Sequence, residues 1–217
     1  MSEDYPLKDN SSSVWLDEKL DSVFERLGGF GRYQWFLSIT FVLMSKSVSI
    51  ITNTISFLTK APEEYYCTFA GSEESFICKP EDFCEDPTVT SYMPNMELAD
   101  SYDNWILKYD LTCGSKMQIG IIGSSPFIGW VFTLMFIPRL ADIFGRYRIM
   151  LVCNLITLAA FVTLMLSQSY AMLIVSMFTL GMTSTSRVQV GVIYLYECLT
   201  RANYLKVLTC AAAFEAL

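Results

Sequence analysis

The chain has 217 residues, of which 53% are hydrophobic and only 17% are charged, with a net charge of −7. This composition is too apolar for a typical soluble domain and the chain is too long for a single anchor, so it indicates an all-α, multi-pass membrane protein. Histidine is absent, which excludes imidazole bases and histidine-ligated metal sites. Neither a nucleophile–base pair nor a phosphate-binding loop is recognisable, so we expect no enzyme and no cofactor. The acidic balance argues against nucleic-acid binding.

The N-terminal residues 1–34 are predicted to be cytoplasmic, because no apolar signal segment opens the chain. Within them, residues 14–27 have the pattern of an amphipathic helix that ends at a glycine pair. One face of this helix carries the apolar side chains Leu16, Leu20, Val23, Phe24 and Leu27. Such a helix lies in the membrane interface or packs against the bundle, and the sequence does not choose between the two.

Residues 35–58 form the first predicted transmembrane helix, since about 20 apolar residues cross a bilayer. This helix is unusually polar. A stripe at helical spacing contains Lys46, Ser49, Asn53 and Ser56. A lysine facing lipid at the bilayer centre would cost about 3 kcal/mol or more. We therefore expect the stripe to face protein or a water-filled cavity.

Residues 59–116 form a long loop that we place outside the cytoplasm. The stretch from Lys60 to Lys116 holds 12 acids and 4 bases, a net charge of −8, which leaves +1 for the rest of the chain. Four cysteines lie in this loop: Cys67, Cys78, Cys84 and Cys113. An even number of cysteines in an oxidising compartment predicts two disulfides, and the sequence leaves three possible pairings open. Free thiols are the alternative, and the spacing disfavours zinc.

Three further transmembrane helices are predicted at residues 117–137, 150–166 and 171–196. Residues 205–217 begin a fifth helix that is too short to span. The connection at 138–149 is a charged hinge with Arg139, Asp142, Arg146 and Arg148, and the chain is expected to bend at Gly145. Three arginines in a short loop mark the cytoplasmic side.

The fourth predicted helix carries unusual polar groups, namely Thr183, Arg187, Tyr194 and Glu197. At 100° per residue these side chains fall on one broad face. Arg201 follows in the next inner turn.

The hinge resembles the loop between helices two and three of the major facilitator superfamily. Leu140, Ala141, Asp142, Gly145 and Arg146 match its pattern. Pro138 and Tyr147 replace a glycine and a basic residue of that pattern. In that family the loop is understood to latch helices while two halves of the protein rock. The resemblance therefore implies gating or hinge roles for Asp142, Gly145, Arg146, Arg148, Glu197 and Arg201.

Other segments resemble the branch of that superfamily which transports organic cations, anions and zwitterions such as carnitine. The matching features are Phe30–Gln34 before the first helix, the cysteine-containing loop that ends at Trp105–Cys113, Gly181, and Glu197 with Arg201 four residues later. Met177 stands where the branch usually has arginine. The resemblance implies an incomplete N-terminal six-helix half of the fold.

In the superfamily fold, helices one and four line the central cavity. The resemblance thus assigns a substrate cavity to Lys46, Ser49, Asn53, Arg187 and Tyr194. Two bases there would favour an anionic group on the substrate, because guanidinium binds carboxylate or phosphate through paired hydrogen bonds. An internal salt bridge of Arg187 is the alternative.

The function we expect is secondary active or facilitative transport of small organic ions by alternating access, with this chain as part of the transporter. The implied partners are the lipid bilayer, a small organic ion, and a second half-domain or other membrane subunits. The alternative is a degenerate transporter half that serves as a structural subunit of a membrane complex. We expect the plasma membrane, with the mitochondrial inner membrane as the other possibility.

Overall fold

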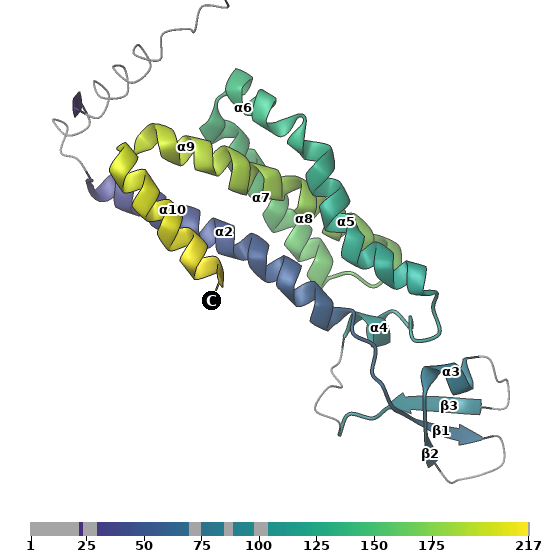
Figure 1. Cartoon of the computed structure of the whole chain (residues 1–217). Helices are drawn as coiled ribbons and strands as arrows, with labels where there is room; N and C mark the ends of the chain where they lie inside the picture. Colours follow the sequence, from purple (N-terminus) through teal and green to yellow (C-terminus); the bar gives the residue numbers. More distant parts are fainter. Residues whose placement is uncertain (1–21, 24–29, 70–74, 85–88, 98–103, 217) are drawn as a thin grey trace, which may run out of the picture.

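The computed structural model describes residues 22–23, 30–69, 75–84, 89–97 and 104–216. A bundle of long helices occupies most of it, and a small sheet lies beyond one end of the bundle (Figure 1). The helix α6 lies at the opposite end from the sheet. The predicted amphipathic helix at 14–27 falls outside the described residues except for Ser22 and Val23, which are helical.

Among the described residues, three helices are long and apolar enough to cross a membrane: α2 (Arg32–Leu58), α5 (Lys116–Leu134) and α7 (Arg146–Met165). The helix α8 (Tyr170–Thr185) has 16 residues, fewer than the roughly 20 that a span requires. It continues without a break into a π-helix, η1 (Ser186–Val190), and then into α9 (Gly191–Cys198). The resulting helical run from 170 to 198 is long enough to cross a membrane. The helix α10 (Arg201–Ala216) follows and packs along α2.

The predicted hinge at 138–149 is largely helical, which differs from the turn that we expected. The helix α6 covers Ile137–Phe144, and α7 already begins at Arg146. Pro138 is tolerated because it lies in the first turn of α6, where a backbone N–H has no helical acceptor. The change of direction is confined to Gly145, whose φ of +92° is a conformation that side chains with a Cβ rarely adopt.

The helices α5 and α8 pack with their backbones in direct contact. A Cβ added at Gly181 of α8 would lie 1.9 Å from the carbonyl oxygen of Pro126, and one at Gly129 of α5 would lie 2.3 Å from that of Phe178. Only glycine permits this approach. Pro126 cannot donate to the carbonyl of Ile122, and the Ser125 hydroxyl donates to that carbonyl instead at 3.0 Å.

Hydroxyl groups link α8 to both α5 and α7. The Thr133 and Thr185 hydroxyls lie 2.7 Å apart between α5 and the end of α8. On the α7 side, Thr157 donates to Thr183 at 2.8 Å, and the hydroxyls of Thr163 and Ser176 lie 3.1 Å apart. Because membrane helices gain no hydrophobic driving force from each other, such hydrogen bonds and small-residue contacts hold the bundle together.

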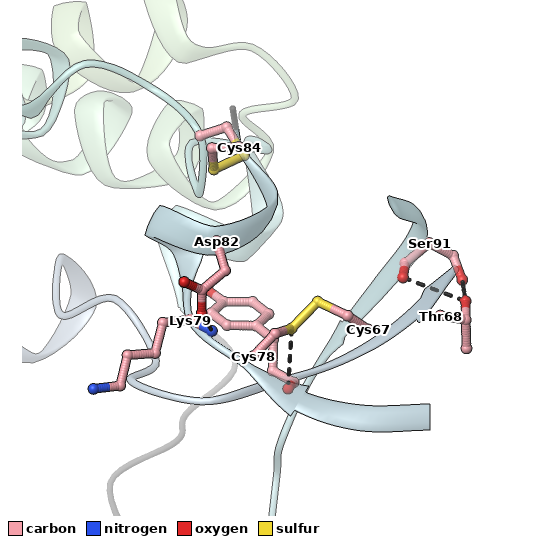
Figure 2. The surroundings of a disulfide bond; sticks show 9 residues. Cys67, Thr68, Cys78, Lys79, Asp82, Cys84 and Ser91 are labelled. Atoms are coloured by element: carbon pink, nitrogen blue, oxygen red, sulfur yellow. Dashed lines mark hydrogen bonds between the residues drawn. A yellow bond between two sulfur atoms is a disulfide. The ribbon is translucent and has the colours of Figure 1, made fainter. Parts of the chain in front are cut away.

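The long loop contains an antiparallel sheet with the strand order β2-β1-β3, built from β1 (Tyr65–Phe69), β2 (Ser75–Cys78) and β3 (Val89–Pro94). The structure confirms two disulfides and assigns their pairing. Cys67–Cys78 joins β1 to β2, and Cys84–Cys113 ties the residue after α3 (Pro80–Phe83) to the segment before α5 (Figure 2). The second disulfide thus anchors the sheet to the helical bundle.

The short helix α4 (Trp105–Lys108) fastens the loop to the end of the bundle (Figure 1). Its Ile106 is fully buried in a cluster with Ile55, Ile122 and Leu173 from three long helices. Asn104 caps α4 because its side-chain oxygen accepts from the backbone N–H groups of Ile106 and Leu107. The amide nitrogen of Asn104 donates to the Lys60 carbonyl.

Replacing Asn104 with alanine removes this cap and leaves buried backbone groups unpaired. We expect Asn104→Ala to lower the stability of the purified protein by about 1–2 kcal/mol. Thermal unfolding in detergent measures the change, and Asn53→Ala, which truncates an exposed amide on α2, is the matched control. Equal melting temperatures for the two variants would contradict the role of Asn104.

Candidate functional site

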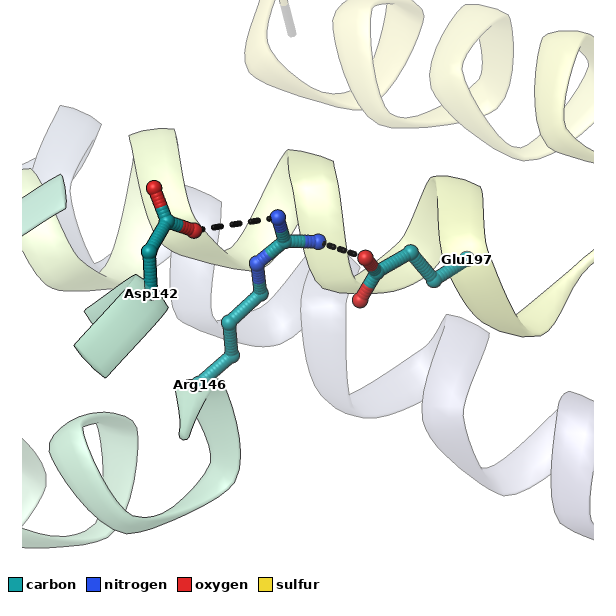
Figure 3. Close-up of polar contacts among 3 residues, drawn as sticks. All are labelled: Asp142, Arg146 and Glu197. Atoms are coloured by element: carbon teal, nitrogen blue, oxygen red, sulfur yellow. Dashed lines mark hydrogen bonds and ion pairs between the residues drawn. The ribbon is translucent and has the colours of Figure 1, made fainter. Parts of the chain in front are cut away.

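Three charged side chains meet at the end of the bundle opposite the sheet. We call Asp142, Arg146 and Glu197 the hinge cluster. Arg146 donates to Asp142 at 3.1 Å and also forms an ion pair with Glu197, so its guanidinium lies between the two carboxylates (Figure 3). The Arg146 guanidinium therefore bridges the hinge and the last turn of α9.

The three residues come from separate elements. Asp142 lies on α6, Arg146 is the first residue of α7, and Glu197 is near the end of α9. A groove of about 720 Å³ surrounds them, and Tyr147, Arg148 and Tyr194 also line it.

The carboxylates of the hinge cluster remain accessible to water. The Asp142 side chain is 62% exposed and that of Glu197 is 51% exposed, whereas that of Arg146 is 21% exposed. Ion pairs of this exposure contribute about 0–1 kcal/mol each. The hinge cluster is thus a contact that can open and close at little cost.

The other predicted hinge residues, Arg148 and Arg201, and also Tyr194 lie near this end of the bundle. Arg148 is exposed on α7, and Arg201 is exposed at the start of α10. The Tyr194 hydroxyl lies 3.0 Å from that of Tyr33, which connects α9 to the beginning of α2. The structure therefore groups Tyr194 with the hinge cluster rather than with the other residues predicted for the substrate cavity.

The polar stripe of α2 has no single environment. The amino group of Lys46 donates to the carbonyl of Phe214 on α10 at 2.8 Å and lies 5.2 Å from the centre of its ring. Ser49 is half-buried, while Asn53 and Ser56 are exposed. Phe214 also lines an apolar groove of about 430 Å³ between α2 and α10. Lys46 thus stands at the junction of these two helices.

Arg187 has hydrogen-bond partners different from those of Lys46. Its side chain lies in the π-helix η1, and the residue is only 3% exposed. One terminal nitrogen, Nη1, donates to the Ser47 hydroxyl at 2.8 Å, and the other, Nη2, donates to the Ser184 hydroxyl at 3.4 Å. Neither serine was predicted as a site residue, because Ser47 lies outside the stripe of Lys46 and serines are common where helices pack closely.

The four polar residues predicted to share one face contact two different helices. Thr183 and Glu197 bond to residues of α7, whereas Arg187 and Tyr194 bond to residues of α2. Tyr194 and Glu197 differ in this way although both lie in α9, so one broad helix face contacts both α2 and α7.

Comparison with known proteins identifies the family. The sequence model of the Major Facilitator Superfamily matches residues 83–217, which is more than half of the chain. The chain belongs to the major facilitator superfamily. A search of curated proteins found no significant match. The superfamily consists of membrane transporters, and the three long apolar helices agree with an integral membrane protein of this kind. Its members are transporters rather than enzymes, which fits the absence of catalytic motifs from the sequence.

Proposed function

We propose that this chain is the N-terminal half of a transporter that moves small organic ions across a membrane by alternating access. Membership of the superfamily supports transport. The resemblance of Phe30–Gln34, the cysteine loop and Glu197 to the organic cation, anion and zwitterion branch supports the substrate class. Alternating access requires a second half-domain that rocks against this one around a site near the middle of the bilayer.

The observation that carries the proposal is the hinge cluster. Arg146 connects the α6–α7 hinge to α9, so it holds one relative position of these elements. Because both ion pairs are exposed, they bias this position by about 1 kcal/mol rather than locking it. A bias of that size changes the ratio of two conformations about fivefold. This is the behaviour required of a latch that opens once in each transport cycle.

Lys46 and Arg187 are our candidates for setting the sign of the substrate charge. Lys46 is the more accessible of the two and donates to a main-chain carbonyl, which a stronger acceptor on a substrate would replace. Arg187 contributes positive charge from inside the helix packing. We therefore expect an anionic group on the substrate.

The hinge cluster is tested by Glu197→Gln, which keeps the shape of the side chain and removes its charge. We expect uptake per molecule at the membrane to fall about fivefold, because the latched conformation loses its bias. Uptake of labelled organic anions and cations into cells or proteoliposomes containing the full-length protein measures this. Arg146→Lys, which keeps the charge but loses the planar fork, should give an intermediate loss.

The control is Glu81→Gln, which makes the same change at an exposed position on α3, far from the hinge. Its uptake should equal that of the unmodified protein. Unchanged uptake in Glu197→Gln would show that the hinge cluster does not take part in transport.

A further inference from the structure

Arg187 has unused hydrogen-bonding capacity in a place that water does not reach. Two of its nitrogens donate to Ser47 and Ser184, but the third, Nε, is buried and has no partner among the described residues. A buried N–H group without an acceptor costs about 1–3 kcal/mol, so an acceptor is expected at this position.

Arg187 also lacks a counter-charge in the part of the chain that the structure describes. The ion pairs found there join Arg146 to Asp142 and to Glu197, which lies near the end of α9. A buried charge without a partner costs several kcal/mol even after the protein relaxes. The internal salt bridge that the sequence left open as an alternative therefore has no acidic partner within the described residues.

A second buried donor without a partner among the described residues lies on α5. The indole nitrogen of Trp130 on α5 is buried and has no partner among the described residues. Trp130 and Ser184 line one small cavity of about 20 Å³, which has room for a single species of the size of water. Ser184 also accepts from Nη2 of Arg187, but Arg187 and Ser47 do not line this cavity. The unpaired Nε of Arg187 can only donate, which suits an anion and excludes a cation.

The local backbone is unusual in the same place. Arg187 lies in η1, which interrupts an otherwise regular helix from 170 to 198. Single π-turns of this kind occur frequently at functional sites. Here η1 contains Arg187, Ser184 lies in the last turn of α8 just before it, and Ser47 of α2 supplies the second hydroxyl group that accepts from the guanidinium.

We propose that Arg187 is the centre of a buried site for one small anionic group, either a halide ion or the carboxylate of a substrate. The unpaired Nε of Arg187 supplies the N–H donor, and Ser47 and Ser184 hold the guanidinium in place. The proposal deepens the proposed function and rests on it only for the substrate carboxylate, since binding of a halide needs no transport.

The experiment measures thermal unfolding of the full-length protein in detergent, in sodium chloride and in sodium gluconate at equal ionic strength. We expect the melting temperature to rise with chloride and to saturate, as binding to the folded state requires. Arg187→Gln should abolish the shift. Arg139→Gln, the same change at an exposed arginine of α6, should preserve it. Ser184→Ala removes one hydroxyl group that holds the guanidinium, so it should weaken the apparent chloride affinity several-fold and decides the matter if Arg187→Gln does not fold.

Benzoate separates the two sources of the anion. If benzoate competes with chloride for the Arg187-dependent shift, the site takes the carboxylate of an organic anion; if only halides act, the site holds an inorganic ion. A melting temperature that does not depend on the anion, or a chloride shift that persists in Arg187→Gln, would overturn the proposal.

Cys153 provides the remaining test. This buried residue of α7 lies close to Arg187, and its thiolate would be an alternative counter-charge. The anion site predicts that Cys153→Ser keeps the chloride shift. If the thiolate were the counter-charge, the unmodified protein would show no chloride shift and Cys153→Ser would gain one, and that pair of results would overturn the proposal. An uptake failure with an intact chloride shift would contradict the proposed transport and leave the anion site in place.

Discussion

Gly181→Ala is expected to destabilise the bundle by about 3 kcal/mol or more, the upper range for overpacking a close-packed core. The added Cβ would lie 1.9 Å from the Pro126 carbonyl oxygen and 2.6 Å from two further backbone atoms of that residue. Backbone cannot rotate away as a side chain can, so α5 and α8 would have to separate. Thermal unfolding in detergent, followed by the loss of the monodisperse peak in size-exclusion chromatography, measures the effect.

Gly120 and Gly123 supply the controls on the same pair of helices. Both lie inside α5, and a Cβ at either position would meet nothing within 4 Å. Alanine there should leave stability unchanged or raise it by up to about 1 kcal/mol through helix propensity. If Gly181→Ala were as stable as Gly120→Ala, the close contact between α5 and α8 would be wrong.

Removing the disulfide between Cys84 and Cys113 should have the second large effect. The two residues are 29 positions apart, and a crosslink over such a length contributes about 3–4 kcal/mol to the stability of the folded loop. We expect the Cys84→Ser, Cys113→Ser variant to release the sheet while the helices stay folded. Protease cleavage within residues 59–116 should then be about 100-fold faster, because each 1.4 kcal/mol is a factor of ten.

The control for this prediction is Cys210→Ser, which removes an exposed free cysteine from α10. Its cleavage rate should match that of the unmodified protein. The variant that removes Cys67 and Cys78 should show a smaller increase, since those residues are only 11 positions apart. Equal protease resistance with and without the Cys84–Cys113 bond would contradict the anchoring role.

Features that depend on composition and length were predictable from the sequence. Apolar runs such as residues 150–166 identify a membrane helix directly, because the bilayer sets the length that is needed. An even number of cysteines in one acidic loop indicated two disulfides, but four cysteines allow three pairings, and only the sheet register shows that Cys67 and Cys78 lie on neighbouring strands.

The helical hinge was predictable in principle. Ile137, Leu140, Ala141 and Phe144 recur at helical spacing before Gly145, and the charges between them obscured this signal. The π-turn at 186–190 was not, since no local residue pattern announces it. It contains Arg187, whose guanidinium donates to Ser47 on α2.

The central claim is that this chain works as one half of an alternating-access transporter. The most direct measurement extracts the protein from its native membrane in mild detergent and determines the mass and subunit composition of the particle. We predict a particle that contains a second bundle of similar size, on the same polypeptide or on one partner chain. A large assembly that holds this chain at fixed stoichiometry without such a second half would contradict the claim and identify the chain as a structural subunit.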